Sequence, residues 1–388
     1  MSRARVSIKG LEDYADDDKV VGAVRACLEP LGGMGAFVKP GQKVLLKVNI
    51  VTPLAPERAA TTHPAMVRAV ARLALEAGGR VSVGDSPGIG DPAKVLETCG
   101  IAAVMRELKL ELADFRNTAT FECAENRVAK RLDLAKAAAD ADVIITIPKP
   151  KTHMQMTYTG AVKNQFGLIP GTRKAQYHYR LETREWLAML MVDINRMARP
   201  ALCIMDAVYG MDGEGPSSGN PRKIAAVLAS SDLPAMDAVC CAIIGQDPEQ
   251  VPTQAACRES GFGTTELEDI EVLGDDWKKF RLRDFELVKR VSSVPFLPLP
   301  KAAHKWIREQ LSPRPRIIND KCILCMACFK GCPVEPSAID PRREAARQVN
   351  DKTCIRCYCC HEFCPEKAIR LRKSWLDRIF RLSALIGR

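Results

Sequence analysis

Nine of the sixteen cysteines of this sequence lie between Cys322 and Cys364, in two runs with the same spacing. Each run contains C-x2-C-x2-C-x3-C-P, and the second begins 32 residues after the first. In paired runs of this kind, three thiolates of one loop bind a four-iron cluster and the distant fourth cysteine completes the neighbouring cluster. The spacing therefore predicts two 4Fe-4S clusters with these ligand sets: Cys322, Cys325, Cys328 and Cys364 for one, and Cys354, Cys357, Cys360 and Cys332 for the other.

Cys359 is the one cysteine of the second run outside this register, and we expect it to bind neither cluster. Structural zinc is a poor alternative, because zinc sites take four ligands as two pairs. A radical adenosylmethionine enzyme is disfavoured, since no C-x3-C-x2-C run occurs. The eight cysteines in register resemble those of bacterial two-cluster ferredoxins, which implies a small α+β electron-transfer module. The scattered cysteines are expected to fill the core: Cys27, Cys99, Cys123, Cys203, Cys240, Cys241 and Cys257.

The C-terminal part of the chain is strongly basic. Residues 313–388 contain 16 Lys and Arg against 8 Asp and Glu, and so contribute +8 of the net charge of +10. Two explanations of this charge stay open: partial compensation of the negative clusters on a solvated surface, or docking of an acidic redox partner protein. Nucleic-acid binding is not expected, because no recognition motif accompanies the charge.

The last residues, 372–388, place apolar side chains at helical spacing among arginines and predict a basic amphipathic helix. We expect this helix to dock on its own protein. A peripheral contact with an anionic membrane surface is the less favoured alternative.

The whole chain has 388 residues, of which 47% are hydrophobic and 27% charged, as is typical of a globular protein with two or three packed units. No apolar run approaches the roughly 20 residues of a membrane span. The first residues lack the apolar segment of a secretory signal, so the expected compartment is the reducing cytoplasm.

Strand and helix patterns alternate over residues 1–285 and predict a layered α/β domain with a mostly parallel sheet. Strands are predicted at 43–51, 80–85, 141–148, 201–206 and 270–275, and helices at 63–79 and 232–245. A Pro-rich linker with a short helix is expected at 286–312, followed by the two-cluster ferredoxin module at 313–371.

Polar residues gather after the predicted strands and in the segments between them. Because the carboxyl ends of parallel strands form one rim of a sheet, these residues are expected to meet there. Several lysines at one site favour an anionic ligand, either a phosphate or a carboxylate. The residues concerned are Lys47, Asn49, Asp85, Ser86, Lys149, Lys151, His153, Lys163, Asn164 and, in the loop after Asp206, Glu214.

Seven ordered motifs in this domain resemble the iron-sulfur protein family called domain of unknown function 362, over about residues 40–275. The motifs are KVN (47–49), TTHP (61–64), GDSPG (84–88), PKPKTH (148–153), GAVKNQFGLIPG (160–171), GMDGEGP (210–216) and SDLPAMDAV (231–239). The resemblance implies the fusion to a two-cluster module but no substrate. The family usually has proline where this chain has Val48, which puts the shape of the first loop in question.

Two functions follow as hypotheses. In the first, an oxidoreductase passes electrons through the clusters to an anionic small molecule or cofactor at the rim, with Lys149, Lys151, His153, Lys163 and Asp85 as catalytic residues. The ligand would then be bound by Lys47, Asn49, Ser86, Asn164 and Glu214. In the second, the protein is a ferredoxin-type carrier or assembly factor whose α/β domain binds a ligand or partner without turnover.

Overall fold

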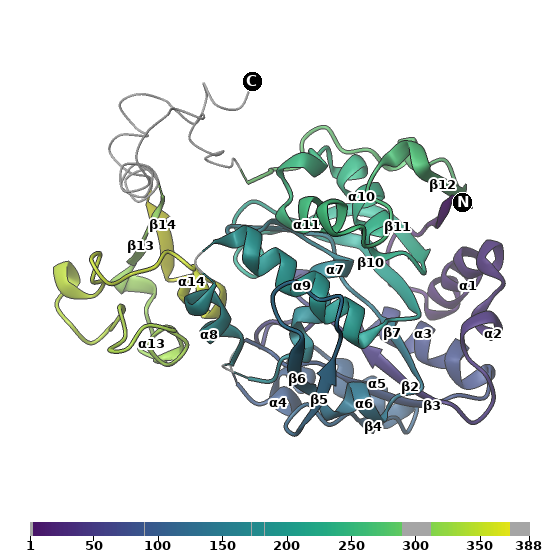
Figure 1. Ribbon diagram of the computed structural model, residues 1–388, viewed down its shortest axis with the longest axis horizontal. Helices are drawn as coiled ribbons and strands as arrows, with labels where there is room; N and C mark the ends of the chain where they lie inside the picture. Colours follow the sequence, from purple (N-terminus) through teal and green to yellow (C-terminus); the bar gives the residue numbers. More distant parts are fainter. Residues whose placement is uncertain (1–2, 89, 172, 182, 289–311, 373–388) are drawn as a thin grey trace.

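A computed structural model describes residues 3–88, 90–171, 173–181, 183–288 and 312–372 of the chain. Within these residues, ten strands form one sheet, with eight in the order β12-β1-β11-β10-β7-β2-β3-β4 and with β8 and β9 attached beside β10 (Figure 1). The strands are β1 (Ala4–Gly10), β2 (Lys43–Lys47), β3 (Arg80–Gly84), β4 (Glu111–Leu112), β7 (Val143–Thr146), β8 (Lys151–His153), β9 (Thr157–Thr159), β10 (Leu202–Asp212), β11 (Asn220–Ser230) and β12 (Ile270–Gly274). Most neighbouring pairs are parallel; β11 pairs antiparallel with both β1 and β10, and β9 with β8.

Helices cover both faces of this sheet (Figure 1). Alternate residues of β2 face opposite sides, with Leu45 in one core cluster and Val44 and Leu46 in the other. Such a strand is apolar on both faces, as strands of parallel sheets usually are. The helices are α1 (Asp17–Leu28), α2 (Met34–Phe37), α3 (Pro64–Glu76), α4 (Pro92–Thr98), α5 (Ile101–Glu107), α6 (Lys136–Asp140), α7 (Ala161–Asn164), α8 (Arg173–Arg180), α9 (Arg184–Ala198), α10 (Leu233–Ile244) and α11 (Pro252–Ser260). The predicted layered α/β domain is confirmed.

Local sequence signals explain where the two predicted helices begin and end. The side chain of His63 accepts a hydrogen bond at the start of α3, and Pro64 occupies the first turn, where its missing N–H costs nothing. Asp232 caps α10, which ends at the left-handed Gly245. Both helices were predicted correctly.

The predicted strand ends were less accurate. The first predicted strand, 43–51, stops at Lys47, where the chain turns into the rim. The strand predicted at 201–206 continues to Asp212, because β11 pairs with it past a bulge between Ala207 and Tyr209. Asp206 therefore lies within a strand and does not open a loop. A separate hairpin is formed by β5 (Thr118–Glu122) and β6 (Arg131–Ala135).

The C-terminal module is a small α+β unit (Figure 1). β13 (Arg314–Ile317) and β14 (Ile369–Arg372) pair antiparallel, and Ile339 bridges Val349 in the equivalent place of the second repeat. The helices α13 (Ala327–Lys330) and α14 (Cys359–Phe363) each follow a cysteine loop. Segments before each loop thus pair with segments after each Cys-Pro, as the repeat indicates.

Two predicted segments lie largely outside the described residues. The linker predicted at 286–312 is described only at its ends, where the backbone oxygen of Glu286 accepts a 2.8 Å hydrogen bond from Gly213. Only Arg372 is described of the predicted C-terminal helix. None of the helices in the described ranges combines the length and apolar composition needed to traverse a bilayer.

Candidate functional site

Two cavities in the C-terminal module are lined by its cysteines in register. Cavity A, as we name the first, contains Cys322, Cys325, Cys328 and Cys364, together with apolar side chains such as Ile317 and Ile369. Cavity B contains Cys332, Cys354, Cys357 and Cys360, together with Val334 and Ile339. The structure thus brings together the two sets of four cysteines that the spacing indicates.

The two cysteine loops share an unusual backbone shape. Each has two non-glycine residues in the left-handed conformation, at the same two positions: Leu324 (φ 54°) and Met326 (φ 63°) in one loop, and Arg356 (φ 60°) and Tyr358 (φ 62°) in the other. The left-handed conformation costs an L-residue about 1–2 kcal/mol. The surrounding structure must therefore stabilise each loop in this shape.

The residues of both cavities fit a 4Fe-4S cluster, because such clusters are held by four cysteine thiolates. Within the described ranges, no group of three or more His, Cys, Asp or Glu side chains is arranged to hold a single metal ion.

A third cavity, of about 80 Å³, lies between the module and the large domain; we call it the inter-module cavity. The large domain contributes polar side chains from the carboxyl ends of its strands and from the segment after β9. The module contributes one side of the cavity. The lining includes Asn49, Asp85, Ser86, Lys151, Lys163, Asn164, Phe166, Lys174, His178, Cys359, Glu362 and Phe363.

Helix α14 and the residue after it line both the cysteine cavities and the inter-module cavity. Cys360 lines cavity B, and Cys364 directly after the helix lines cavity A. Cys359, Glu362 and Phe363 of the same turn line the inter-module cavity. One helical turn therefore connects the cysteine loops with the rim of the sheet.

Direct contacts hold the module against the large domain. Ser217 Oγ donates a 2.8 Å hydrogen bond to the backbone oxygen of Glu362, and Lys367 Nζ donates one of 3.1 Å to that of Gly219. The ring of Phe363 packs so closely on Gly88 that a Cβ there would collide with it. Two of the motif loops of the large domain, GDSPG and the loop that follows GMDGEGP, thus serve as docking points.

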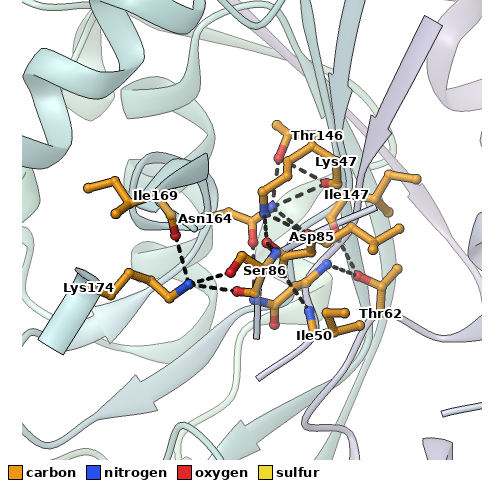
Figure 2. A network of polar contacts seen from close by, with 12 residues as sticks. Lys47, Ile50, Thr62, Asp85, Ser86, Thr146, Ile147, Asn164, Ile169 and Lys174 are labelled. Atoms are coloured by element: carbon orange, nitrogen blue, oxygen red, sulfur yellow. Dashed lines mark hydrogen bonds and ion pairs between the residues drawn. The ribbon is translucent and has the colours of Figure 1, made fainter. Parts of the chain in front are cut away.

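A buried ion pair lies at the base of the inter-module cavity (Figure 2). Lys47 Nζ and Asp85 Oδ1 are 2.7 Å apart, and both side chains are almost fully buried. Asp85 also accepts hydrogen bonds from the backbone N–H of Ile50 and of Ser86, both 2.8 Å. Burial lowers the pKa of Lys47 although the Asp85 carboxylate opposes this. These contacts fix the turns that follow β2 and β3.

Amides and a lysine continue this network. Asn164 donates to Thr146 Oγ1 (2.8 Å) and accepts from Asn49 Nδ2 (3.1 Å), while Lys151 Nζ donates to Asn49 Oδ1 (2.6 Å) and to the oxygen of Ala60 (2.8 Å). Among the residues that the structure describes, no carboxylate lies within hydrogen-bond distance of Lys151 Nζ. Its pKa is far below the usual value, first because of burial and then because of the nearby Lys163.

Two further lysines differ in how they are held. Lys174 Nζ donates to Ser86 Oγ (2.9 Å), to Ser86 O (3.0 Å) and to Ile169 O (2.9 Å), as Figure 2 shows. Burial lowers the pKa of Lys174 to about 7. Lys163 lines the same cavity, and no ion pair or hydrogen bond holds its ammonium group in the described part of the chain. Lys163 is therefore the ammonium group most available to a ligand.

The predicted residues Lys47, Asn49, Asp85, Ser86, Lys151, Lys163 and Asn164 therefore meet around one cavity or directly beneath it. His153 lies beside it, on β8, where its Nε2 faces Glu362 Oε1 at 3.2 Å. His178 contributes a ring whose buried Nδ1 has no hydrogen-bond partner among the described residues, and burial lowers its pKa to about 3.

Two predicted site residues are placed elsewhere. Lys149 points away from the cavity, because its Nζ is bound by Asp206 Oδ2 (2.9 Å) and by the hydroxyl of Tyr14 (3.2 Å). Glu214 is exposed and lines a groove on the module, and only its backbone oxygen contacts His361. The acidic groups that face the cavity are Asp85 and Glu362.

Several lining residues were missed by the sequence analysis. Lys174 lies in a helix with no motif, and Glu362 and Phe363 belong to the cysteine segment rather than to the rim. Cys359 was recognised only as out of register, although that position is what turns its side chain from cavity B toward the inter-module cavity. An extra cysteine outside the repeated spacing is a signal that could have identified α14 as one side of the inter-module cavity.

Comparisons with known proteins agree with this division of the chain. Residues 44–242 match the model of the Domain of unknown function (DUF362), and residues 314–365 match the 4Fe-4S dicluster domain. The chain is 38% identical over 281 residues to the thylakoid-associated protein of Synechocystis sp., covering 70% of this chain and 87% of that protein.

Two solved structures show more distant likeness. The lactate racemase apoprotein from Thermoanaerobacterium thermosaccharolyticum has a TM-score of 0.39 at 15% identity, covering 60% of this chain and 55% of that one. A protein from Thermotoga maritima has a TM-score of 0.33 at 16% identity, covering 55% of each chain. Likeness at this level carries no argument about function.

The dicluster match supports iron-sulfur clusters and a role in electron transfer. The motifs around the rim and the match over residues 44–242 identify the large domain. The chain is a member of the DUF362 family, fused to a C-terminal 4Fe-4S dicluster domain.

Proposed function

We propose that the protein is an oxidoreductase that passes electrons from its iron-sulfur module to a small anion bound in the inter-module cavity. The observation that carries this proposal is the double role of α14. Cys360 of this turn lines cavity B, while Cys359, Glu362 and Phe363 line the inter-module cavity. A ligand in that cavity would therefore lie within one helical turn of a cluster-binding cysteine.

The charge of the cavity supports an anion. Lys151, Lys163 and Lys174 line it, against the two carboxyl groups of Asp85 and Glu362. The Asp85 carboxylate is already paired with Lys47, which is a fourth lysine. Burial acts on both signs of charge, because it raises the pKa of Glu362 and lowers the pKa of Lys151, Lys163 and Lys174. The balance favours a carboxylate or another small anion over a cation.

Each cavity residue has a role that follows from its contacts. When bound, the clusters supply one-electron transfer. Lys163 binds the anion directly, and Phe166 and Phe363 exclude water from one side. Ser86 Oγ accepts hydrogen bonds from Gly171 N (2.7 Å) and from Lys174, so the hydroxyl hydrogen of Ser86 can be donated to the ligand. Lys174 is then placed to return a proton to Ser86.

The test is reoxidation of the reduced holoprotein. Anaerobically reconstituted protein would be reduced, freed of reductant, and mixed with sulfate, bicarbonate and a set of short mono- and dicarboxylates, while recovery of the cluster absorbance is followed. At least one anion is expected to reoxidise the wild type, and Lys163→Met should slow this at least about tenfold, equivalent to about 1.4 kcal/mol. Lys130→Met, which changes an exposed lysine of the large domain, should leave the rate unchanged.

Two results would count against the proposal. Equal rates for Lys163→Met and wild type would remove the cavity as the site of reaction. Anions that bind but never accept electrons would favour the carrier or assembly-factor alternative. For the compartment we propose the cytoplasm, where a reducing environment protects cluster ligands from disulfide formation.

A further inference from the structure

The two-stranded ribbon β13–β14 has two chemically different faces. On its inner face, Ile317 and Ile369 are opposite each other in register and line cavity A, and Pro315 lines cavity B. On the outer face the register pairs Arg314 with Arg372, and Arg316 with Arg370. Residues directly opposite in an antiparallel pair share one face, so four arginines lie together there.

This arrangement is unfavourable for the ribbon alone. Like charges directly opposite each other destabilise a strand pair. Asp351 compensates only one side, with its carboxylate 2.6 Å from Arg316 and 3.4 Å from Arg314. Arg370 and Arg372 are exposed, and no side-chain ion pair or hydrogen bond of either is found in the described ranges. Four arginines that repel one another on an exposed face indicate that this face binds a negatively charged partner.

A groove of about 710 Å³ runs beside this face. Its charged lining is mainly basic, with Arg316, Lys321, Arg370 and Arg372 against the single acid Glu214. A groove of this size, without deep burial, fits the side chains of a partner protein better than a small molecule. The charge selects an acidic partner.

The groove adjoins the first cysteine loop. Ile317 lines both the groove and cavity A. In that loop Ile323 is 62% exposed and Leu324 55% exposed, directly after Cys322 and before Cys325. Large exposed apolar side chains rimmed by basic ones are typical of a protein interface. The face that would receive a partner therefore lies next to cavity A, whereas α14 leads from cavity B to the inter-module cavity.

We propose that the outer face of β13–β14, together with Ile323 and Leu324, docks an acidic one-electron carrier protein that delivers electrons at cavity A. One electron would leave the reduced carrier, oxidising it, and would reduce the cluster that the four cysteines of cavity A would hold; no proton or bond changes in this step. The direction of flow is then carrier, cavity A, cavity B and inter-module cavity. The last step rests on the proposed function, while the docking does not.

The experiment uses the full-length holoprotein and a reduced plant-type 2Fe-2S ferredoxin, an acidic one-electron carrier, as probe. Anaerobic stopped-flow at low salt measures the second-order rate of probe oxidation. The variant Arg370→Glu/Arg372→Glu should lower this rate at least about tenfold and remove most of its dependence on ionic strength, since steering of this kind contributes about 10–10³-fold. Arg370→Gln/Arg372→Gln should fall between this variant and wild type.

The matched control is Lys278→Glu/Lys279→Glu, which makes the same change in net charge at two exposed lysines of the large domain. Its rate should stay within about twofold of wild type, because steering depends on charge near the docking site. Iron content and reduction by dithionite should be the same in all variants, which separates failed docking from failed cluster assembly.

Three outcomes would overturn the docking proposal. The first is equal loss of rate in the arginine and lysine variants. The second is no loss in the arginine variant. The third is binding of phosphatidylglycerol vesicles that the arginine variant loses while its rate with the carrier is unchanged, which would make this face a membrane contact. A proposed function that fails in the anion experiment would leave the carrier rates as they are.

Discussion

The Nε2 atom of His153 lies 3.2 Å from Oε1 of Glu362, and this contact joins the large domain to the iron-sulfur module. His153 Nδ1 accepts hydrogen bonds from the backbone N–H of Gln155 and Met156, both 3.2 Å, so the ring proton belongs on Nε2 and faces Glu362. Burial lowers the pKa of His153 far below its usual value, and burial raises the pKa of Glu362. Because the lowered pKa leaves the imidazole neutral, the contact is a polar latch between the domains rather than an ion pair.

The first prediction concerns this latch. A double-mutant cycle of His153→Ala and Glu362→Ala should give a coupling energy of about 0.5–3 kcal/mol, because the two side chains contact each other between the domains. Denaturant unfolding of the holoprotein measures it. Purely additive effects would show that the modules are held by other contacts alone.

The second prediction concerns the cysteines. Reconstituted protein should contain about eight iron and eight sulfide ions per chain. Cys359→Ala should keep this content, because Cys359 lines the inter-module cavity, whereas Cys360→Ala should lose or convert one cluster. Metal analysis and electron paramagnetic resonance after reduction provide the measurement. Stoichiometric zinc, or equal iron loss in both variants, would contradict the assignment.

The third prediction concerns the buried pair Lys47–Asp85. Lys47→Met should lower the free energy of unfolding by about 3–5 kcal/mol, because it leaves a buried carboxylate without its cation. The control is Lys136→Met, which removes a solvent-exposed pair with Asp140 and should leave the free energy of unfolding close to that of wild type. Comparable losses in the two variants would mean that Asp85 is solvated in solution.

The fourth prediction concerns pH. Lys174 has a folded-state pKa of about 7, so its ammonium charge is present below that pH and lost above it. Sulfate does not change charge over the window from about pH 6 to about pH 9, so its affinity for the protein should fall as pH rises through about 7. Lys174→Met should flatten this dependence in a calorimetric titration.

Stability provides an independent check on Lys174. Because its pKa is lowered on folding from 10.5, the unfolded chain binds more protons between about pH 7 and 10.5. The stability of wild type relative to Lys174→Met should therefore rise with pH across that window. A difference that stays constant or falls would contradict the burial of a titrating lysine.

The fifth prediction uses glycine as a probe of close approach. A Cβ on Gly167 would collide with Asp85 and lie 2.8 Å from Nζ of Lys47, so Gly167→Ala should lower both stability and anion affinity. Gly22 is an exposed residue inside α1 with open space around its Cα. Gly22→Ala should instead stabilise the protein by about 0.5–1 kcal/mol. Unfolding and binding measurements on the two variants distinguish crowding at the cavity from a general effect of the substitution.

Much of this architecture could be predicted from the sequence. What could not be predicted depends on contacts between residues far apart in the chain. The cysteine sets follow from spacing because ligand loops are local, and β2, β3 and β7 follow from short apolar runs. Lys149 could not be separated from Lys151 in the sequence, because residues two apart in an extended segment are expected on the same face. The ammonium group of Lys149 pairs with the carboxylate of Asp206, which is far away in sequence. Only the folded sheet brings these two residues together.

The cavity residues that belong to the iron-sulfur module could not be predicted for a similar reason. Glu362 and Phe363 lie about two hundred residues from Lys163 in sequence. The spacing of apolar residues does not predict which side of a cysteine loop contacts another domain. Gly88 and Ser217 fit the module by shape and by one hydrogen bond, and neither property leaves a pattern in the chain.

If the proposed function holds, the position of α14 would couple cluster assembly to the shape of the inter-module cavity. A newly synthesised chain without iron, or a chain whose clusters oxygen has destroyed, has no ligand to order Cys360 and Cys364, and the turn between them is also the cavity wall. Such a chain would hold its anion poorly. Iron supply and oxygen exposure would then set how many copies of the protein can bind the proposed anion.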